Sequence, residues 1–286
     1  MPEMPIHLWE PTSLFQNDYA GYAEAGRSRI EQSKIAFVGL ARNCDIALAE
    51  NLMRIESLSK MCKDWRLHIE SNDCEDKTVE VLAAFSREHK NASFHYRDLG
   101  RKHYPSEFSG RRTIALAEYR TMCQRWVRSS AADADYVVVI DFDAMGGWNE
   151  TGFLNGLGWM VELQGAYGMA SLSLFQHDPV GQAPQWLHYD LWALRGIGQR
   201  NCYFDSYRNN CGGFGFTWIP PVGSPPVLVS SAFGGLCIYR TGPYLLGEYD
   251  GTSDVEHATF HESIARKTGM NLYLNPSQRM IMSWIE

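Results

Sequence analysis

Short apolar runs alternate with segments of helical period along the first half of the chain. The runs predict buried strands, and the segments between them place apolar residues three and four positions apart, as amphipathic helices do. Strands that alternate with helices are typical of an open, mostly parallel, doubly wound α/β sheet. The predicted strands are 34–40, 65–70, 93–97 and 136–141, and the predicted helices are 46–62, 79–89 and 113–128.

The second half of the chain has a less regular pattern. It predicts a helix at 153–164, a strand at 167–175, two strands around a Gly-Gly break within 227–239, a helix at 253–268 and a strand at 270–274. Residues 177–226 are dense in Gly, Pro and aromatic residues, and no element is predicted for 277–286. Residues 1–33 are weakly periodic but aromatic, so we expect an N-terminal extension packed on the main domain.

The composition is that of a globular protein with a sizeable core, with 286 residues of which 45% are apolar and 21% charged. The net charge of −7 argues against nucleic-acid or anionic-membrane partners, because both favour a basic face. No apolar run approaches the roughly 18 residues of a spanning helix, and the N-terminus lacks a signal-peptide pattern. Seven scattered cysteines favour a reducing, cytoplasmic location, with a Cys202–Cys211 disulfide as the alternative.

Two carboxylates follow the apolar run 136–140. Alternate residues of a strand face the same side, so Asp141 and Asp143 are expected to project together from the carboxyl end of this strand. Carboxylates that close repel one another unless a cation lies between them. Mg²⁺ or Mn²⁺ is the expected ion, since both prefer oxygen ligands.

Polar residues also follow the first two predicted strands, and the carboxyl ends of neighbouring parallel strands bind ligands. The turn Ala41-Arg42-Asn43 ends the first strand, and Glu70 and Asp73 end the second. A carboxylate there can accept hydrogen bonds from a base or a ribose. Helix capping is the alternative role for Asp73 and for Asp76.

Two arginines lie about two turns apart, one just before the predicted helix 113–128 and one within it. Arg112 and Arg120 can share one face of that helix, where they would pair with phosphate oxygens. The alternative is a solvated basic helix.

The segment 253–261 has two interpretations. Ser253-x-x-Glu256 fits a capping box, in which Glu256 has a structural role only. Alternatively, His257 and His261 lie one turn apart on a shared face, as metal ligands can.

Between these segments the chain offers aromatic and glycine residues that suit a sugar ligand. Trp192 can stack on a sugar ring, and Asp190 and Arg195 are unusual among core residues, although plain core packing is the alternative. Gly234 and Gly235 would let the backbone approach a ligand closely.

Together these residues resemble nucleotide-sugar glycosyltransferases of the Rossmann-like GT-A fold, over about residues 34–276. Five motifs in order look like the cryptococcal-type, capsule-associated alpha-mannosyltransferases: Tyr119-Arg120, Asp141-Phe142-Asp143, and the segments 189–195, 233–239 and 256–261. The resemblance implies a nucleotide-sugar-binding half at 34–150 and an acceptor-binding, catalytic half at 151–286 of the same domain, with an aromatic-rich acceptor side.

The resemblance also implies roles for the residues. Residues 41–43 and Glu70 would hold the nucleoside of a GDP- or UDP-linked donor, and Asp143 with Asp141 would bind Mn²⁺ or Mg²⁺. His257 or His261 would complete the metal site, with His261 preferred. Glu256 would face the donor sugar or act as base toward a glycan or other hydroxyl acceptor, with Asp190 as the second catalytic candidate; the family suggests retention at the anomeric carbon.

Two other functions fit part of the pattern. An Asp-x-Asp phosphohydrolase would use Asp141 as its nucleophile, but that class usually carries its motif on the first strand. A non-catalytic carbohydrate-binding protein on a transferase fold is the second alternative. The sequence leaves the donor, the acceptor and the oligomeric state open.

Overall fold

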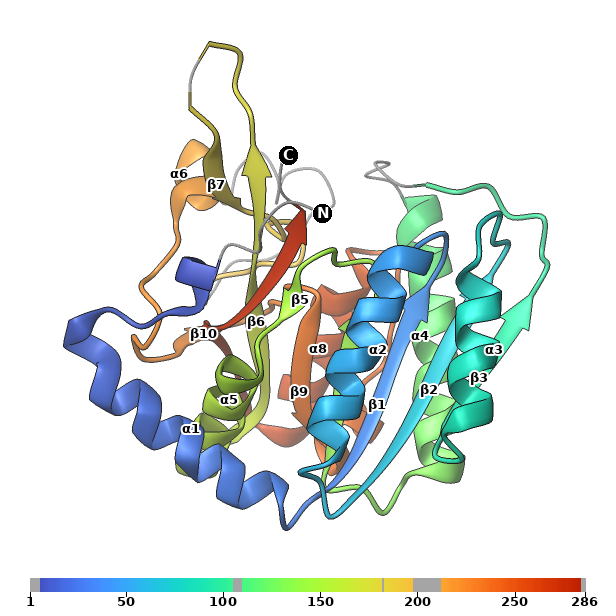
Figure 1. Ribbon diagram of the computed structural model, residues 1–286, viewed down its shortest axis with the longest axis horizontal. Coiled ribbons are helices and arrows are strands. Elements are labelled where there is room, and N and C mark those ends of the chain that lie inside the picture. The colour runs from blue at the N-terminus through green and yellow to red at the C-terminus, as the bar shows by residue number, and fades with distance from the viewer. Residues whose placement is uncertain (1–5, 105–109, 182, 198–211, 284–286) are drawn as a thin grey trace.

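The computed structural model describes residues 6–104, 110–181, 183–197 and 212–283. Within these residues one sheet runs through the molecule in the order β3-β2-β1-β4-β9-β6-β10-β5, with β7 paired to β6 and β8 to β10 (Figure 1). Helices cover both faces of this sheet, so the predicted doubly wound α/β class is confirmed.

The amino-terminal half forms the parallel part of the sheet. Strand β1 pairs in parallel with β2 and β4, and β2 pairs in parallel with β3. In this register Leu40 lies opposite both Glu70 and Asp141, so the three strand ends are level. The elements are β1 (Lys34–Ala41), α2 (Asp45–Ser59), β2 (Asp64–Asn72), α3 (Thr78–Glu88), β3 (Ala92–Arg97), α4 (Gly110–Ser130) and β4 (Tyr136–Asp141).

The carboxyl-terminal half makes the sheet mixed. Strand β9 runs antiparallel to both β4 and β6, whereas β6 and β10 are parallel. Strands β6 and β7 form a hairpin that projects beyond the domain, with α6 beside β7 (Figure 1). The elements are β5 (Gly147–Trp148), α5 (Glu150–Glu162), β6 (Ala166–His177), β7 (Gln185–His188), α6 (Gly212–Thr217), β8 (Val227–Val229), β9 (Leu236–Arg240), α7 (Thr241–Leu246), α8 (Glu256–Thr268) and β10 (Asn271–Ser283).

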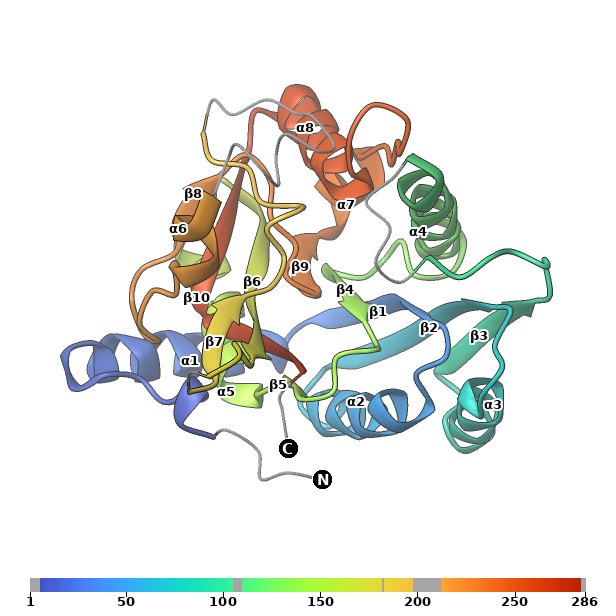
Figure 2. The same ribbon diagram turned by 90° about the horizontal axis from the view of Figure 1, so that it is seen from above.

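The two helical layers enclose two apolar cores. Helices α1 (Gln16–Ile30), α2, α3 and α5 lie on one face of the sheet, and α4, α7 and α8 lie on the other (Figure 2). The buried runs of β1 and β4 alternate between these cores. Phe37 and Val138 belong to the first core, and Val38 and Val139 belong to the second. This alternation explains why those strands read as continuous apolar runs.

The structure contains elements that the sequence does not predict, among them β5, β7, α6 and α7. The segment before β1 contains two 3₁₀ turns, Ile6–Trp9 and Ser13–Phe15, and the helix α1 (Gln16–Ile30). This helix packs along α5 so closely that a Cβ on Gly26 would lie 1.8 Å from the Leu154 carbonyl oxygen. Strand β10 continues far beyond 274, because a register shift between Asn275 and Arg279 absorbs the polar residues that interrupt the apolar pattern.

Candidate active site

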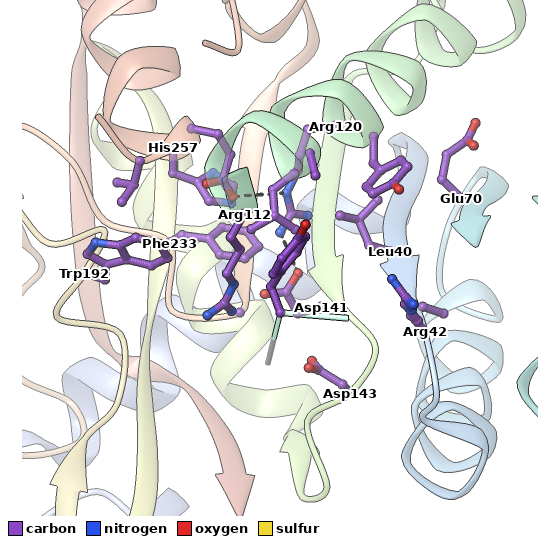
Figure 3. A pocket seen from close by; sticks show the side chains of 18 of the residues that line it. Leu40, Arg42, Glu70, Arg112, Arg120, Asp141, Asp143, Trp192, Phe233 and His257 are labelled. Carbon is purple, nitrogen blue, oxygen red and sulfur yellow. Dashed lines mark hydrogen bonds and ion pairs between the residues drawn. The ribbon is translucent and has the colours of Figure 1, made fainter. Parts of the chain in front are cut away.

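A cavity of about 350 Å³ opens at the level ends of β1, β2 and β4. Helix α4, the segment 189–193, the loop 233–235 and the start of α8 form its other walls. In Figure 3, Arg42 and Glu70 lie at one end, and Trp192 and His257 lie at the other, with Asp141 between them. This is the position at which doubly wound sheets bind ligands.

The two aspartates occupy the middle of the cavity. Asp141 ends β4, and its carboxylate accepts a hydrogen bond from Arg120 Nη2 at 2.6 Å. Asp143 lies just past the strand, with its side chain exposed to the cavity. The density of surrounding protein atoms, and then the nearby Asp141 carboxylate, raise the pKa of Asp143 to about 6. Because the Asp143 side chain is open to water in the cavity, we attribute the raised pKa mainly to the Asp141 charge.

Arg120 lies buried beneath the aspartates, with 3% of its side chain exposed. Its guanidinium carbon lies 4.7 Å from the centre of the Phe233 ring, and its Nε lies 3.9 Å from a Glu256 carboxylate oxygen. Burial alone would lower the pKa of Arg120, but the facing carboxylates of Asp141 and Glu256 raise it. The solvated alternative is therefore wrong for Arg120. Arg112 is half-buried and lies over the Trp192 ring at 5.4 Å.

Glu256 is the first residue of α8, and its carboxylate lines the cavity. The capping-box interpretation is wrong, because the N-cap is Val255, and the Ser253 hydroxyl bonds to Asp250 instead. Burial raises the pKa of Glu256 to about 7, although the Arg120 charge opposes this shift. Glu256 is thus a carboxyl group that can hold or release a proton near neutral pH.

The two histidines of α8 have different surroundings. His261 is fully buried, with Nδ1 2.9 Å from the Ser231 hydroxyl and Nε2 2.8 Å from the Tyr239 hydroxyl, and it does not line the cavity. His257 lines the cavity and stacks on Phe233 at 3.8 Å, and neither ring nitrogen has a hydrogen-bond partner among the described residues. Burial lowers the pKa of His257 well below its usual value, and that of His261 to about 3. Of the pair, only His257 is placed to reach a ligand, contrary to the preference for His261.

The far end of the cavity is formed by the first two strand ends. Residues 41–43 and Glu70 line it, and the Glu70 carboxylate lies 3.1 Å from a ring nitrogen of each of His68 and His95. Burial raises the pKa of Glu70, but these histidine contacts outweigh burial and lower it. Glu70 is therefore an ionised acceptor at the cavity wall.

Asp73 does not line the cavity. It has a φ of 46° and accepts hydrogen bonds from the backbone amides of residues 99–101 at 2.6, 2.7 and 3.3 Å. Together with Arg42, which donates to the carbonyls of Arg101 and Lys102, it fixes a loop that carries cavity residues. The capping alternative holds for Asp76, whose carboxylate accepts the amides of Asp45 and Thr78 at the start of α2 and α3.

The remaining predicted residues divide between the cavity and its supports. Asp190 and Trp192 line the cavity, but the Asp190 carboxylate already accepts the backbone amides of Gly234 at 2.9 Å and Ala193 at 3.3 Å. Burial raises the pKa of Asp190 and outweighs these two hydrogen bonds, which lower it. Gly235 lines the cavity, whereas Gly234 does not. Arg195 lies outside the cavity and pairs with Asp254 at 2.8 Å.

Sequence reasoning missed several cavity residues. No role was assigned to the segment 101–104, yet Arg101, Lys102 and His103 line the cavity. Phe233, which supports both Arg120 and His257, was singled out only as part of a motif. The proposed Cys202–Cys211 disulfide lies outside the described residues.

No protein-family model matches the chain, and no curated protein matches it in sequence. Solved structures do match. GalNAc-T7, determined with UDP, GalNAc and Mn²⁺, has a TM-score of 0.52 and 10% identity, over 99% of this chain and 55% of that chain. The fold is of the GT-A type.

Two further matches are with a Pyrobaculum calidifontis mannosyltransferase and with TarS from S. aureus. The former, in complex with GDP-Man and Mn²⁺, has a TM-score of 0.49 and 11% identity, over 94% of this chain and 66% of that chain. TarS has a TM-score of 0.49 and 11% identity, over 87% of this chain and 60% of the TarS chain. At such identities the likeness concerns the fold, and the resemblance to capsule-associated mannosyltransferases stays a prediction. No helix among the described residues is long and apolar enough to cross a membrane.

Proposed function

We propose that the protein is a metal-dependent glycosyltransferase that moves a sugar from a GDP- or UDP-linked donor to a hydroxyl group of a glycan or other acceptor. The observation that carries this proposal is the single cavity in which Asp141 and Asp143 lie between Glu70 at one end and Trp192 at the other. GalNAc-T7, which shares the fold, was determined with UDP, GalNAc and Mn²⁺, and this supports a nucleotide-sugar donor and a divalent ion.

The residues present fit Mn²⁺ or Mg²⁺ bound together with a diphosphate. Among the described residues, no three His, Cys, Asp or Glu side chains converge closely enough to hold an ion alone. Asp143 presents a carboxylate that is open to the cavity beside that of Asp141, which is the hard oxygen chemistry these ions prefer. Asp143 would be the first ligand and Asp141 the second, with phosphate oxygens and water completing the shell. His257 is the nitrogen donor that lines the same cavity, but it does not converge with the two aspartates in this structure.

On the nucleoside side, the chain supplies an acceptor and a fixed wall. The ionised Glu70 carboxylate can accept hydrogen bonds from the base or ribose, and residues 41–43 form the adjoining backbone. Arg112 would bring positive charge to the diphosphate. The bound ion, when present, supplies the positive charge that stabilises the departing nucleoside diphosphate.

On the sugar side, the chain supplies a carboxyl group and an aromatic surface. Trp192 can stack on a sugar ring, and Glu256 lines the same cavity beside His257. A carboxyl group with a pKa of about 7 can accept the proton of an acceptor hydroxyl, or can hydrogen-bond the donor sugar. The resemblance to alpha-mannosyltransferases favours the second role, with retention at the anomeric carbon, and makes GDP-mannose the first donor to test.

A thermal-shift screen tests the proposal. GDP-mannose, UDP-GalNAc, UDP-GlcNAc and UDP-glucose are each added with and without Mn²⁺. A donor at 100 times its Kd stabilises the folded state by about 2.7 kcal/mol, which is a melting-temperature rise of about 5–10 °C for a domain of this size. We expect one donor to give this rise only with Mn²⁺, and Asp143→Asn to abolish it. The exposed Asp178→Asn serves as the matched control and keeps the response.

The outcome separates the proposal from its rivals. If no donor stabilises the wild-type protein, or if Asp143→Asn responds as the wild type does, the metal-dependent transferase is wrong. A sugar-binding protein without activity would respond to free sugars regardless of Mn²⁺. The phosphohydrolase is disfavoured because Asp141, its expected nucleophile, is held by Arg120 at 2.6 Å.

A further inference from the structure

The loop that carries Asp143 connects β4 to β5 and passes beside α2 (Figure 2). Its outer residues are bonded to neighbouring strands. The Phe142 amide donates to the Leu40 carbonyl at 3.3 Å, and the Met145 amide donates to the Met282 carbonyl at 3.0 Å. Phe142 and Ala144 are both fully buried, so their carbonyl groups, which flank Asp143 on either side, need partners within the protein.

A single side chain bonds to both carbonyl groups, and the Ala144 carbonyl also accepts the Gly147 amide at 3.2 Å. Asn51 of α2 is fully buried, and its Nδ2 donates to the Phe142 carbonyl at 3.1 Å and to the Ala144 carbonyl at 2.9 Å. Its neighbours on the same helix face, Leu48 and Ile55, are apolar core residues. A buried amide among them is unfavourable unless its hydrogen bonds are made, and here both donor hydrogens are used on the loop.

The orientation of this amide is fixed from its other side. Arg54 donates from Nη1 to Asn51 Oδ1 at 3.3 Å, and from Nε to the Trp148 carbonyl at 3.1 Å. Gly147 packs against the same oxygen, since a Cβ there would lie 2.3 Å from Asn51 Oδ1. The Asn51 amide therefore has one placement, with its oxygen toward Arg54 and its NH₂ toward the Asp143 loop.

We infer that Asn51 is a positioning residue that fixes the backbone on both sides of Asp143 and so holds this carboxylate ready for the divalent ion. The inference rests on the proposed function, in which Asp143 is the first metal ligand. Groups that orient metal ligands through hydrogen bonds typically change metal affinity 10- to 100-fold when they are removed. Asn51 acts through the loop and does not itself touch the ion.

The test is the affinity for Mn²⁺, measured by electron paramagnetic resonance of the free ion with saturating GDP or UDP. We expect Asn51→Ala to raise the Mn²⁺ Kd about 10- to 100-fold. Leu58→Ala, a buried residue two turns further along α2, is the matched control for loss of stability. We expect it to lower the melting temperature and to leave the Mn²⁺ Kd within about twofold of wild type, as a change remote from the ligands should.

The possible outcomes are distinct. An unchanged Kd in Asn51→Ala, or an equal rise in Leu58→Ala, overturns the positioning role. If Asn51→Ala does not fold, Arg54→Met replaces it, with a rise of a few fold expected because only the support of the amide is lost; an unchanged Kd there also overturns the role. Failure of the wild-type protein to bind Mn²⁺, or full binding by Asp143→Asn, refutes the metal assignment in the proposed function and the inference with it.

Discussion

The ion pair between Arg120 and Asp141 gives the sharpest prediction about what holds the site together. The Arg120 side chain is 3% exposed and that of Asp141 is 29% exposed, with 2.6 Å between the charged atoms. Removing one partner of a fully buried pair costs about 3–5 kcal/mol, whereas a fully exposed pair contributes about 0–1 kcal/mol. This pair lies between these limits, so we expect a coupling energy of about 2–3 kcal/mol.

The perturbation is a double-mutant cycle of Arg120→Met and Asp141→Asn. Both replacements roughly keep the side-chain volume, so the loss of the charge pair dominates over cavity formation. The free energy of unfolding is measured by urea denaturation of the metal-free protein at pH 7.5 for the wild type, both single variants and the double variant. We expect each single variant to lose about 3 kcal/mol, and the double variant to lose clearly less than the sum.

A surface pair in the same protein serves as the control. Lys34 and Asp133 lie 2.7 Å apart, but their side chains are 39% and 49% exposed. The same cycle on that pair should give a coupling energy below about 1 kcal/mol. A coupling energy for Arg120 and Asp141 no larger than that of the surface pair would refute the view that Arg120 anchors the metal-binding aspartate.

Three further predictions concern acid stability, the glycine loop and the catalytic carboxyl group. Burial lowers the pKa of His188 to about 4, so the unfolded chain binds a proton at this residue before the folded chain does as the pH falls from about 6.5 to about 4. His188 should therefore lower the free energy of unfolding by up to about 1.4 kcal/mol per pH unit over that window, and His188→Leu should make the pH dependence shallower by that amount in urea denaturation at pH 7, 6 and 5, while the slope from the buried His257 and His261 remains. Gly234→Ala should lower the free energy of unfolding in urea by about 3 kcal/mol or more, because the φ of Gly234 is +64° and a Cβ there would lie 2.0 Å from the Ser171 carbonyl oxygen. Gly21→Ala is the control and should be neutral or stabilising, because no atom lies within 4 Å of a Cβ at Gly21. Equal effects of the two substitutions would contradict the strain argument. If Glu256 is the base toward the acceptor, Glu256→Gln should lower the turnover number about 100-fold or more with the donor Kd nearly unchanged; a raised donor Kd identifies the contact to the donor sugar instead, and full activity with an unchanged Kd would exclude both roles.

The parallel half of the fold was predictable because each strand end carries its own signal. The apolar runs of β1 and β4 are buried on both faces, and the register sets Leu40 level with Glu70 and Asp141. The level strand ends place Glu70 and the aspartates at one site, and this part of the cavity is therefore predictable from the sequence.

The remaining differences arise from tertiary contacts that local patterns do not contain. Helix α1 has small residues where it meets α5, so its apolar period is weak. Spacing alone does not distinguish His257 from His261. In the structure, His257 stacks on Phe233 at the cavity, whereas His261 bonds to Tyr239 in the core. Asn51 occupies a helical position that would suit an apolar residue, and its partners lie about 90 positions away in the sequence.

The central claim is tested most directly by following the products of a nucleotide sugar. The protein is incubated with the donor that stabilises it, Mn²⁺ and a panel of glycan acceptors, and the nucleoside diphosphate and the glycosylated product are detected by mass spectrometry. The account predicts both products, their loss on removal of Mn²⁺ by a chelator, and their loss in Asp143→Asn. Release of inorganic phosphate from simple phosphate esters, without turnover of any nucleotide sugar, would contradict it.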